Sequence, residues 1–551
     1  MIRFLSLNRV FLIVFQLMIG CFLSSSYMLF AQQPKLVVGI VVDQMRYDYI
    51  DRYWEKFGNE GFKRLVKEGF FCKNTHYNYV PTYTAPGHAS VYTGTSPSVH
   101  GIIANNWFDK ETNTFVYCTE DKTVSAIGGS EKSGQMSPER LFTTTLGDQL
   151  KLSDNFQSKV IGIALKDRGA ILPAGHSADA AYWYDGITGN WMSSTFYLKE
   201  LPEWVKEFNK RELPRHYLEN TWNTLLPLEQ YSESTKDDNP YEKLYAGLSR
   251  PVFPYNLKDL MPANEQLNLL RSTPFGNSIT KDFAIATIKS ENMGKGNSTD
   301  LLAISFSSTD YIGHQFGPNS IETEDAYLRL DRDLAELLKF LDEWVGRDQV
   351  LLFLTADHGA AENATFLREH RIPAGSFNDA QLIKKTKSFL YAMYHDSLVL
   401  SVSNQQVFLN HTMIAEQKLK MEDVENTLVD FLLKEKGVEN VFTSFNITNW
   451  GMTEGLKARI QNGFNQKRSG DLMINYFPYW TDNQSTTGTT HGSPYEYDTH
   501  VPLIFYGNGI KTGSTNDPID ITDIATTICN LLNIQEPNGC SGKVINELKN
   551  R

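Results

Sequence analysis

Five short runs of consecutive apolar residues, rich in β-branched side chains, recur along the chain. They are LVVGIVV (36–42), VIGIAL (160–165), LLAISF (301–306), VLLFLTA (350–356) and VPLIFYG (501–507). Strands that are apolar on both faces belong in a buried, mostly parallel sheet, because helices cover both of its sides. These runs therefore predict the strands of one large central sheet.

Helical patterns lie between the apolar runs. Residues 321–345 carry apolar side chains at a spacing of three to four, and residues 520–532 predict a last helix. Residues 137–152 begin with Ser137 as a good cap and Pro138 at the first helical position. Because strands and helices alternate, we expect an α/β fold: a three-layer α/β/α sandwich with a mostly parallel central sheet.

Two stretches interrupt this alternation. Residues 185–280 and 400–485, with approximate limits, are rich in Trp, Tyr, Pro and Asn and have weak periodicity. We interpret them as cap or loop insertions in a single domain that spans residues 32–551. They would either cover and flank a functional site or pack at the periphery without a role in specificity.

The N-terminus has the pattern of a signal peptide, residues 1–31. Arg3 and Arg9 provide the positive start, residues 10–23 are largely apolar, and Ala31 precedes a plausible cleavage point. The apolar run is short for a membrane span of ~20 residues. We therefore expect a periplasmic or secreted protein without stable membrane association after cleavage; a retained membrane anchor is the alternative.

If the protein is exported, its cysteines are expected to form disulfides. Cys72, Cys118, Cys529 and Cys540 form an even set beyond the signal peptide, and an oxidising compartment favours disulfides. We expect Cys529–Cys540, which is short-range, and Cys72–Cys118, which follows by exclusion. A four-cysteine zinc site is disfavoured because no Cys-x-x-Cys spacing occurs.

The net charge of -12 excludes nucleic acid and anionic membranes as expected partners. An anionic substrate would therefore depend on local cations or metals. Acidic and histidine side chains beside the ends of the apolar runs could supply such a site: Asp43, Asp310, His314, Asp357, His358 and His491. In an open α/β sheet, ligands bind beyond the carboxyl ends of the strands.

Each of these residues alone is more typical of a helix cap or a structural histidine. Together, six oxygen and nitrogen donors without an adjacent Lys or Arg would repel one another unless cations neutralise them. Mixed Asp and His ligation suits two zinc ions, with three protein ligands for each. Asp310 and His314 share one face if their segment is helical, although Gly313 favours a turn.

Thr84 lies in TYTAPGH, directly before Ala-Pro-Gly and a segment that could begin a helix. A free hydroxyl is a poor nucleophile, but a coordinated metal and the unpaired N–H groups of a helix N-terminus stabilise the alkoxide. The alternative is a plain N-cap. Beside a two-metal site, we favour a nucleophile.

Lys166 and Arg168 follow the apolar run at 160–165. If the chain stays extended there, their spacing directs both cations to one face. The planar fork of Arg and the compact charge of Lys together suit a terminal phosphate with two negative charges. Two solvated surface cations are the alternative. A diester carries one negative charge, so this pair favours monoesters.

Seven segments occur in an order that we recognise: VVDQMRYD, TYTAPGHAS, HGIIANNWFD, LKDRGAILPAGHSADAAYWYD, SSTDYIGHQFGP, TADHG and THGSP. From about residue 34 to 545, the chain resembles the alkaline phosphatase superfamily. It is most similar to the bacterial alkaline phosphatases that use a threonine nucleophile and a Lys-x-Arg pair. The resemblance implies an alkaline phosphatase-like fold and a zinc-dependent phosphate monoester hydrolase with a phospho-threonine intermediate.

The resemblance also assigns residues. One zinc would be held beside Thr84 by Asp43, Asp357 and His358, and the other, on the leaving-group side, by Asp310, His314 and His491. Asn105, Lys166 and Arg168 would bind phosphoryl oxygens. The implied partners are two Zn²⁺ per chain and small-molecule phosphate monoesters, with inorganic phosphate as an inhibitory product. We expect a monomer.

Two other functions compete with this one. A phosphodiesterase or nucleotide pyrophosphatase of the same superfamily would use the same metals, and a non-enzymatic exported protein could bind phosphate or metal. A sulfatase is disfavoured, because Thr84 and His88 stand where its Cys/Ser-x-Pro-x-Arg motif needs other residues. We expect structural roles for the remaining histidines considered: His88, His100, His176, His395 and His500.

Overall fold

The structure is a computed structural model that describes residues 33–482 and 486–549. The predicted signal peptide, residues 1–31, lies outside the described residues. Among the residues that are described, no helix combines the length and the hydrophobicity that crossing a bilayer requires.

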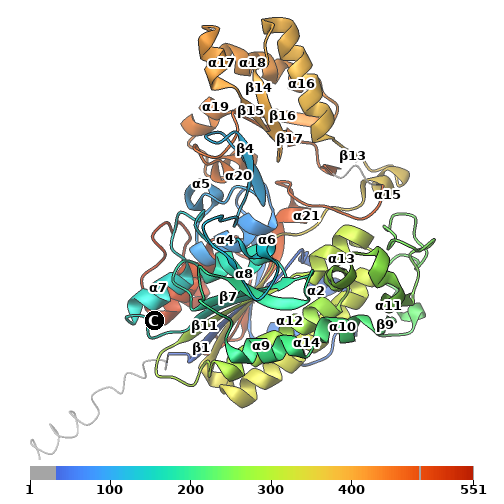
Figure 1. Ribbon diagram of the computed structural model, residues 1–551, viewed down its shortest axis with the longest axis vertical. Helices are drawn as coiled ribbons and strands as arrows, with labels where there is room; N and C mark the ends of the chain where they lie inside the picture. The colour runs from blue at the N-terminus through green and yellow to red at the C-terminus, as the bar shows by residue number, and fades with distance from the viewer. Residues whose placement is uncertain (1–32, 483–485, 550–551) are drawn as a thin grey trace, which may run out of the picture.

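An 11-stranded sheet forms the centre of the molecule (Figure 1). Along the sheet the strands are β20 (Gly513–Thr515), β2 (Phe70–His76), β19 (His500–Gly507), β12 (Val350–Thr355), β1 (Leu36–Val42), β11 (Asp300–Phe306), β6 (Val160–Ala164), β7 (Ala180–Asp185), β8 (Asn190–Ser194) and β5 (Ala126–Ile127), with β21 (Ile519–Asp520) beside β2. The central strand β1 pairs in parallel with β11 and β12, and β11 with β6. The predicted α/β fold with a mostly parallel sheet is confirmed.

Strand β19 runs in the opposite direction to this central set. It pairs antiparallel with β12, placing Leu503 opposite Thr355, and antiparallel with β2. Its first residue, His500, therefore lies toward the edge where β12 ends. Residues that precede β19 reach the same edge as residues that follow β1, β11 and β12.

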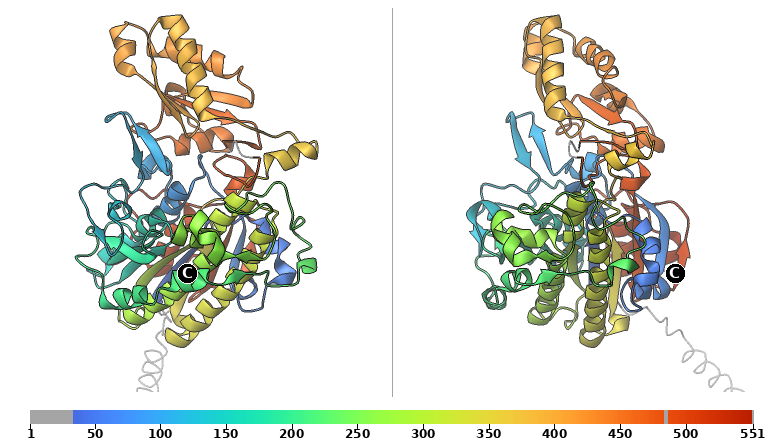
Figure 2. Two further views of the ribbon diagram at one scale, coloured as in Figure 1. Left: turned by 45° about the vertical axis from the view of Figure 1, so that its right-hand side comes forward. Right: turned by 90° about the vertical axis from the view of Figure 1, so that its right-hand side faces the viewer.

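Two groups of helices cover opposite faces of the sheet (Figure 2). One group contains α4 (Thr84–Thr93), α7 (Leu146–Ser153), α8 (Asp167–Ala174) and α22 (Asp523–Leu532); the other contains α3 (Phe62–Glu68), α9 (Glu203–Lys210), α12 (Phe275–Ser290), α13 (Ser308–Phe316) and α14 (Ile321–Trp344). Helix α14 matches the helix predicted for 321–345, and the Ser320 side chain caps it by accepting from the Thr323 N–H.

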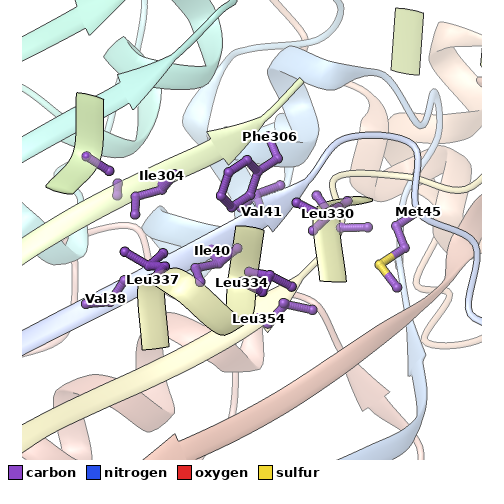
Figure 3. Close-up of a cluster of buried hydrophobic side chains, with 14 of the residues drawn as sticks. Val38, Ile40, Val41, Met45, Ile304, Phe306, Leu330, Leu334, Leu337 and Leu354 are labelled. Atoms are coloured by element: carbon purple, nitrogen blue, oxygen red, sulfur yellow. The ribbon is translucent and has the colours of Figure 1, made fainter. Parts of the chain in front are cut away.

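Alternate residues of β1 point to opposite faces of the main sheet. Val38 and Ile40 pack with Leu334 and Leu337 of α14 (Figure 3). Gly39 points to the other face, where an added Cβ would lie 2.2 Å from the hydroxyl of Tyr92 in α4. The absence of a side chain at this position lets α4 lie close against the centre of the sheet.

Leu334→Ala tests the packing on the α14 face. Leu334 is fully buried, and removing its side chain is expected to destabilise the protein by about 2–5 kcal/mol, through lost burial and the cavity left behind. Leu152→Ala is the control, since that side chain is 55% exposed. Thermal unfolding of both variants measures the difference, and equal melting temperatures would contradict the packing described.

The helix predicted for 137–152 is wrong in its first half. Helix α7 begins at Leu146, and Thr145 caps it: its hydroxyl accepts from the Asp148 N–H while the Asp148 carboxylate accepts from the Thr145 N–H. Ser137 does not cap a helix, because no helix begins between it and Leu146; its hydroxyl accepts from the Glu139 N–H and donates to the carboxylate of Asp121. The predicted last helix is α22, which begins at Asp523.

A second, smaller sheet stands beyond the main sheet, at the top of Figure 1. Its strands, in order, are β14 (Val399–Ser403), β15 (Gln406–Leu409), β17 (Leu472–Tyr476) and β16 (Val438–Thr443), and its helices include α16 (Asp379–Tyr394) and α18 (Met421–Leu432). Leu390, Val407 and Leu428 belong to its separate apolar core. By contrast, Trp191, Phe208 and other side chains of the 185–280 stretch belong to the main core.

The two predicted disulfides are wrong, because Cys72, Cys118, Cys529 and Cys540 are all free thiols. Cys72 lies in the main core, whereas Cys118 belongs to a separate small cluster with Trp107. The Cys540 thiol contacts the hydroxyl of Thr526 at 2.9 Å instead of pairing with Cys529. Burial raises the pKa of Cys118 to about 12, which keeps this thiol protonated.

Thiol titration tests this correction. Protein that lacks residues 1–31, denatured without reductant, is expected to react with a thiol reagent at all four cysteines. A reductant should leave its melting temperature unchanged, since no disulfide constrains the unfolded chain. Two reactive thiols, or none, would restore the disulfides that the sequence suggests.

Candidate active site

The edge of the sheet where β1 and β12 end gathers acidic and histidine side chains from distant parts of the chain. Asp43 directly follows β1, Asp357 and His358 follow β12, Asp310 and His314 lie on α13 after β11, and His491 precedes β19. The structure brings five of these predicted residues together in two overlapping groups, and the sixth, His314, lies beside Asp310 but outside both groups. Ligand atoms lie within 4.8 Å of one another in Asp43, Asp357 and His358, and in Asp310, His358 and His491.

The first group is fully buried. Nε2 of His358 lies 3.6 Å from Oδ1 of Asp43 and 3.5 Å from Oδ2 of Asp357. The other ring nitrogen, Nδ1, contacts the carbonyl oxygen of Gly359 at 3.0 Å. This contact orients the ring so that Nε2 faces both carboxylates.

The second group has Asp310 at its centre. Its Oδ1 lies 3.1 Å from Nε2 of His314 and 3.7 Å from Nε2 of His491. The turn favoured by Gly313 is wrong: α13 is helical, which places Asp310 and His314 on one face. The His314 side chain is 37% exposed, against 5% for His491, so the cluster opens to solvent beside His314.

Backbone carbonyls fix both of these imidazole rings. Nδ1 of His314 contacts the carbonyl oxygen of Thr489 at 2.9 Å, and Nδ1 of His491 contacts that of Thr82 at 2.8 Å. Each Nε2 is thereby left to face Asp310. Such contacts select the tautomer and orientation that a metal ligand requires.

Thr84 is the first residue of α4, at its buried N-terminal end. Its hydroxyl oxygen lies 3.4 Å from Nε2 of His358 and 3.4 Å from Nζ of Lys166. The residue before the helix is Tyr83, so Thr84 does not occupy the N-cap position. Its side chain instead faces both the metal-type donors and a cation.

Of Asn105, Lys166 and Arg168, Lys166 contacts this hydroxyl, while the other two side chains contact Ala85 and Tyr117. Oδ1 of Asn105 accepts from the Ala85 N–H at 2.9 Å, which leaves the amide nitrogen as a donor. Nζ of Lys166 lies 2.6 Å from Asp43 and 2.6 Å from Asp310, so it bridges the two groups. Nη1 of Arg168 donates to the hydroxyl of Tyr117, and its buried Nε has no hydrogen-bond partner.

Lys166 and Arg168 lie in one region, but the extended chain that was predicted for these residues is wrong. Strand β6 ends at Ala164, Lys166 is the N-cap of α8, and Arg168 lies in its first turn. The spacing therefore does not follow an extended strand. Tyr311 lies beside Lys166, with its ring centroid 5.1 Å from Nζ.

Burial and the neighbouring charges shift the pKa values of the site residues. Burial, followed by the Asp357 carboxylate, raises the pKa of Asp43 well above its usual value. Burial acts on Asp310 in the same direction, but His314 and Lys166 outweigh it and hold the pKa of that carboxyl well below its usual value. Burial, followed by His358, lowers the pKa of His491, so its ring is neutral and can donate a lone pair to a metal.

The donor set fits divalent metal. Three buried carboxylates face one lysine, and Oδ1 of Asp43 and Oδ2 of Asp357 are buried without hydrogen-bond partners. Leaving such charges unpaired costs several kcal/mol each, at order of magnitude. Carboxylate and neutral imidazole are the ligands that zinc accepts in open, catalytic sites.

Two further residues hold the site, and the sequence did not identify them. Gln44 donates its backbone N–H to Oδ1 of Asp357 at 3.1 Å and its side-chain amide to Oδ1 of Asp310 at 2.7 Å. The backbone of Gln44 is left-handed, with a φ of 62°. A glutamine rarely adopts this conformation, so the sequence does not predict it. Its position directly after Asp43 was the sole sequence signal.

His88 is the second such residue. One turn after Thr84, its Nδ1 contacts the Thr84 carbonyl oxygen at 2.9 Å and its Nε2 contacts the hydroxyl of Ser305 at 2.9 Å. Nδ1 also lies 3.4 Å from Oδ2 of Asp357. The four-residue spacing from Thr84 was the available signal.

Two other histidines have structural contacts away from this site. His100 contacts the Ser90 hydroxyl at 3.0 Å, and His500 contacts the Lys73 carbonyl oxygen at 2.9 Å.

Comparison with protein families gives a match over most of the chain. The family model described as "Type I phosphodiesterase / nucleotide pyrophosphatase" matches residues 37–494. This match spans the segments that carry all six metal-type donors.

Curated relatives and a solved structure extend this similarity. The chain is 46% identical to alkaline phosphatase PafA of Elizabethkingia meningoseptica, covering 94% of this chain and 95% of the relative. It is 46% identical to alkaline phosphatase PhoV of Synechococcus elongatus, covering 94% of this chain and 93% of the relative. The crystal structure of wild-type PafA matches with a TM-score of 0.91 over 94% of this chain and 99% of the other.

Proposed function

The chain belongs to the type I phosphodiesterase/nucleotide pyrophosphatase family of the alkaline phosphatase superfamily, and we propose that it is a zinc-dependent phosphate monoester hydrolase. The resemblance drawn from the sequence motifs is thereby confirmed at the level of the family. Its similarity over nearly the whole length to proteins named alkaline phosphatase supports monoesters as the substrate class.

The observation that carries the mechanism is the Thr84 hydroxyl, held 3.4 Å from both His358 and Lys166 at the N-terminus of α4. Thr84 Oγ1 attacks phosphorus, the alcohol leaves, and a phospho-threonine remains. Water then hydrolyses this ester and releases inorganic phosphate. The N–H groups of the first turn and the ammonium of Lys166 stabilise negative charge at this position.

Six side chains would hold the two metals: Asp43, Asp357 and His358 beside Thr84, and Asp310, His314 and His491 on the solvent side. Bound zinc would supply Lewis acidity to the phosphoryl group and lower the pKa of water. Asn105, fixed by its contact with Ala85, would donate its amide N–H to a phosphoryl oxygen. Such preorganised donors usually contribute the largest single share of catalysis.

Lys166 contacts the Thr84 hydroxyl and Arg168 interacts with Lys166, and such a pair of cations favours a substrate with two negative charges. Lys166 contacts the carboxylates of Asp43 and Asp310, and the buried Nε of Arg168 has no hydrogen-bond partner. A terminal phosphate offers three oxygens to these donors, whereas a diester replaces one oxygen by a second ester group. We infer a preference for monoesters on this basis.

Arg168→Ala tests that preference. We expect kcat/KM for an aryl phosphate to fall by about 10²-fold, because a charge-assisted contact to the dianion is lost. The rate for a bis-aryl diester should fall by about tenfold or less. Arg211→Ala is the control, since that guanidinium lies over the Phe208 ring, 5.2 Å from its centroid, away from the site. Equal losses on both substrates would contradict the assigned role.

A phosphodiesterase is the second candidate, because the matching family model carries that description. Hydrolysis of an aryl phosphate and its bis-aryl diester by the wild-type enzyme decides between the two. A higher kcat/KM for the monoester supports our proposal, and a clear preference for the diester overturns it. A phosphoryl-threonine trapped at low pH from labelled substrate excludes a protein that only binds phosphate.

We also propose where the enzyme acts, what it binds and how it is assembled. We propose export to the periplasm or medium through residues 1–31, small phosphate esters as substrates and product inhibition by inorganic phosphate. We also propose a monomer with two zinc ions. Chromatography coupled to light scattering and metal analysis of the mature protein test the last two points.

A further inference from the structure

Two glutamates outside the candidate active site are buried without a compensating charge. Glu322, in the first turn of α14, is fully buried, and Glu242, in the loop that follows residue 235, is 3% exposed. Both carboxylate oxygens of Glu242 and Oε2 of Glu322 lack a hydrogen-bond partner. The remaining oxygen, Oε1 of Glu322, accepts from the hydroxyl of Tyr255.

The two carboxylates lie close enough to repel each other. Burial, followed by the Glu322 carboxylate, raises the pKa of Glu242, and Asp237 and Asp238 act in the same direction. Within the described part of the chain, neither glutamate forms an ion pair with Lys, Arg or His. Because an unpaired buried charge is costly, this cluster requires either a proton or a bound cation.

Burial raises the pKa of Glu322 to about 8, while the hydrogen bond from Tyr255 and the first turn of α14 act against this shift. Oε2 of Glu322 and both oxygens of Glu242 are three buried oxygens without a hydrogen-bond partner, and the two side chains interact electrostatically. Asp237 adds a further carboxylate nearby, and Tyr255 adds a hydroxyl. There is no nitrogen or sulfur ligand among these groups, and an oxygen-only set is what Ca²⁺ prefers.

We propose that Glu242 and Glu322 bind a calcium-type divalent cation that fastens the loop around residues 235–243 to α14. The loop is already tied at one end to α13 and at the other to the segment between α13 and α14. The Thr235 N–H donates to the Asn319 carbonyl at 2.8 Å, and the Lys243 N–H donates to the Gln315 carbonyl at 2.8 Å. A cation between these ties replaces the repulsion of two carboxylates with a cross-link between loop and helix.

This site is separate from the proposed zinc centre but adjoins it in the chain, because Gln315 directly follows His314. Its role is therefore structural: it holds the loop against the C-terminal end of α13. Catalytic zinc content does not depend on it.

Tb³⁺ binding to the zinc-loaded full chain tests the proposal, because this ion replaces Ca²⁺ and tyrosines nearby can sensitise its emission. Tyr245 and Tyr255 both interact with Glu322. We expect saturable Tb³⁺ emission that Ca²⁺ displaces, and a loss of at least about tenfold in apparent affinity in Glu242→Gln. Glu229→Gln, at an exposed position before the loop, should keep the wild-type affinity.

Thermal unfolding supplies an independent readout. In calcium-free buffer, adding Ca²⁺ to about a hundred times its Kd should raise the melting temperature of the wild type by about 2–3 °C. Glu242→Gln should lack this response while keeping its zinc content. If Glu242→Gln does not fold, Glu322→Gln takes its place.

Three outcomes overturn the proposal. One is a wild-type chain with no saturable Tb³⁺ emission and no Ca²⁺ response, which requires no variant. Another is a Glu242→Gln variant that responds like the wild type, because the ion would then bind elsewhere. The third is a Glu242→Gln variant that is more stable than the wild type in Ca²⁺, as expected if the pair shares a proton.

Discussion

Thr84→Ala is expected to lower kcat/KM for aryl phosphates by about 10⁴-fold or more, because removal of a nucleophile eliminates the covalent route. The hydroxyl lies between His358 and Lys166, each at 3.4 Å. Thr84 contributes no other ligand to the metal groups, which consist of carboxylates and imidazoles. Metal content and melting temperature should therefore remain close to those of the wild type.

Two controls make this result specific. Thr84→Ser keeps a hydroxyl at the same place and should retain much of the activity. Thr93→Ala removes a buried hydroxyl from the same helix, where it donates to the Ala89 carbonyl at 2.8 Å, and should leave turnover nearly unchanged. Near-full activity in Thr84→Ala with both metals bound would remove the basis for the mechanism.

The sequence predicted the location of the site because parallel strands end at one edge of a sheet. Asp43 and Asp357 each follow a β-branched run directly, so knowing the strands was enough to place them together. His491 precedes its strand, and it reaches the same edge because β19 is antiparallel to β12. A run that is apolar on both faces does not reveal its direction, so this part depended on the resemblance of motifs.

Features that depend on long-range contacts were not predictable. Helix α7 starts late, with Thr145 as its cap, while Ser137 is held by a hydrogen bond to Asp121, a residue 16 positions earlier in the chain. Gln44 supports two ligands through a left-handed backbone that no local signal announces. The prediction of two disulfides was wrong, because the number of cysteines does not reveal which apolar cluster each side chain joins.

From the proposed zinc centre we also predict how the protein behaves without metal. Chelation should lower the activity roughly 10³-fold or more, since the phosphoryl group then loses its Lewis acids. The melting temperature should fall too, because Asp43, Asp310 and Asp357 would share one lysine in a buried space. Zinc added back should restore both properties, and metal-free protein with full activity would contradict the centre.

Asp43→Asn separates the loss of a ligand from general destabilisation. Asp43 has an oxygen without a hydrogen-bond partner beside His358 and Asp357, so the variant should lose the zinc next to Thr84 and nearly all activity. Asp300→Asn is the matched control, because this buried carboxylate lies at the opposite end of the sheet and accepts from the N–H groups of Lys159 and Gly294. It should lose stability but keep two zinc ions per chain. Equal zinc content in the two variants would show that Asp43 is not a ligand.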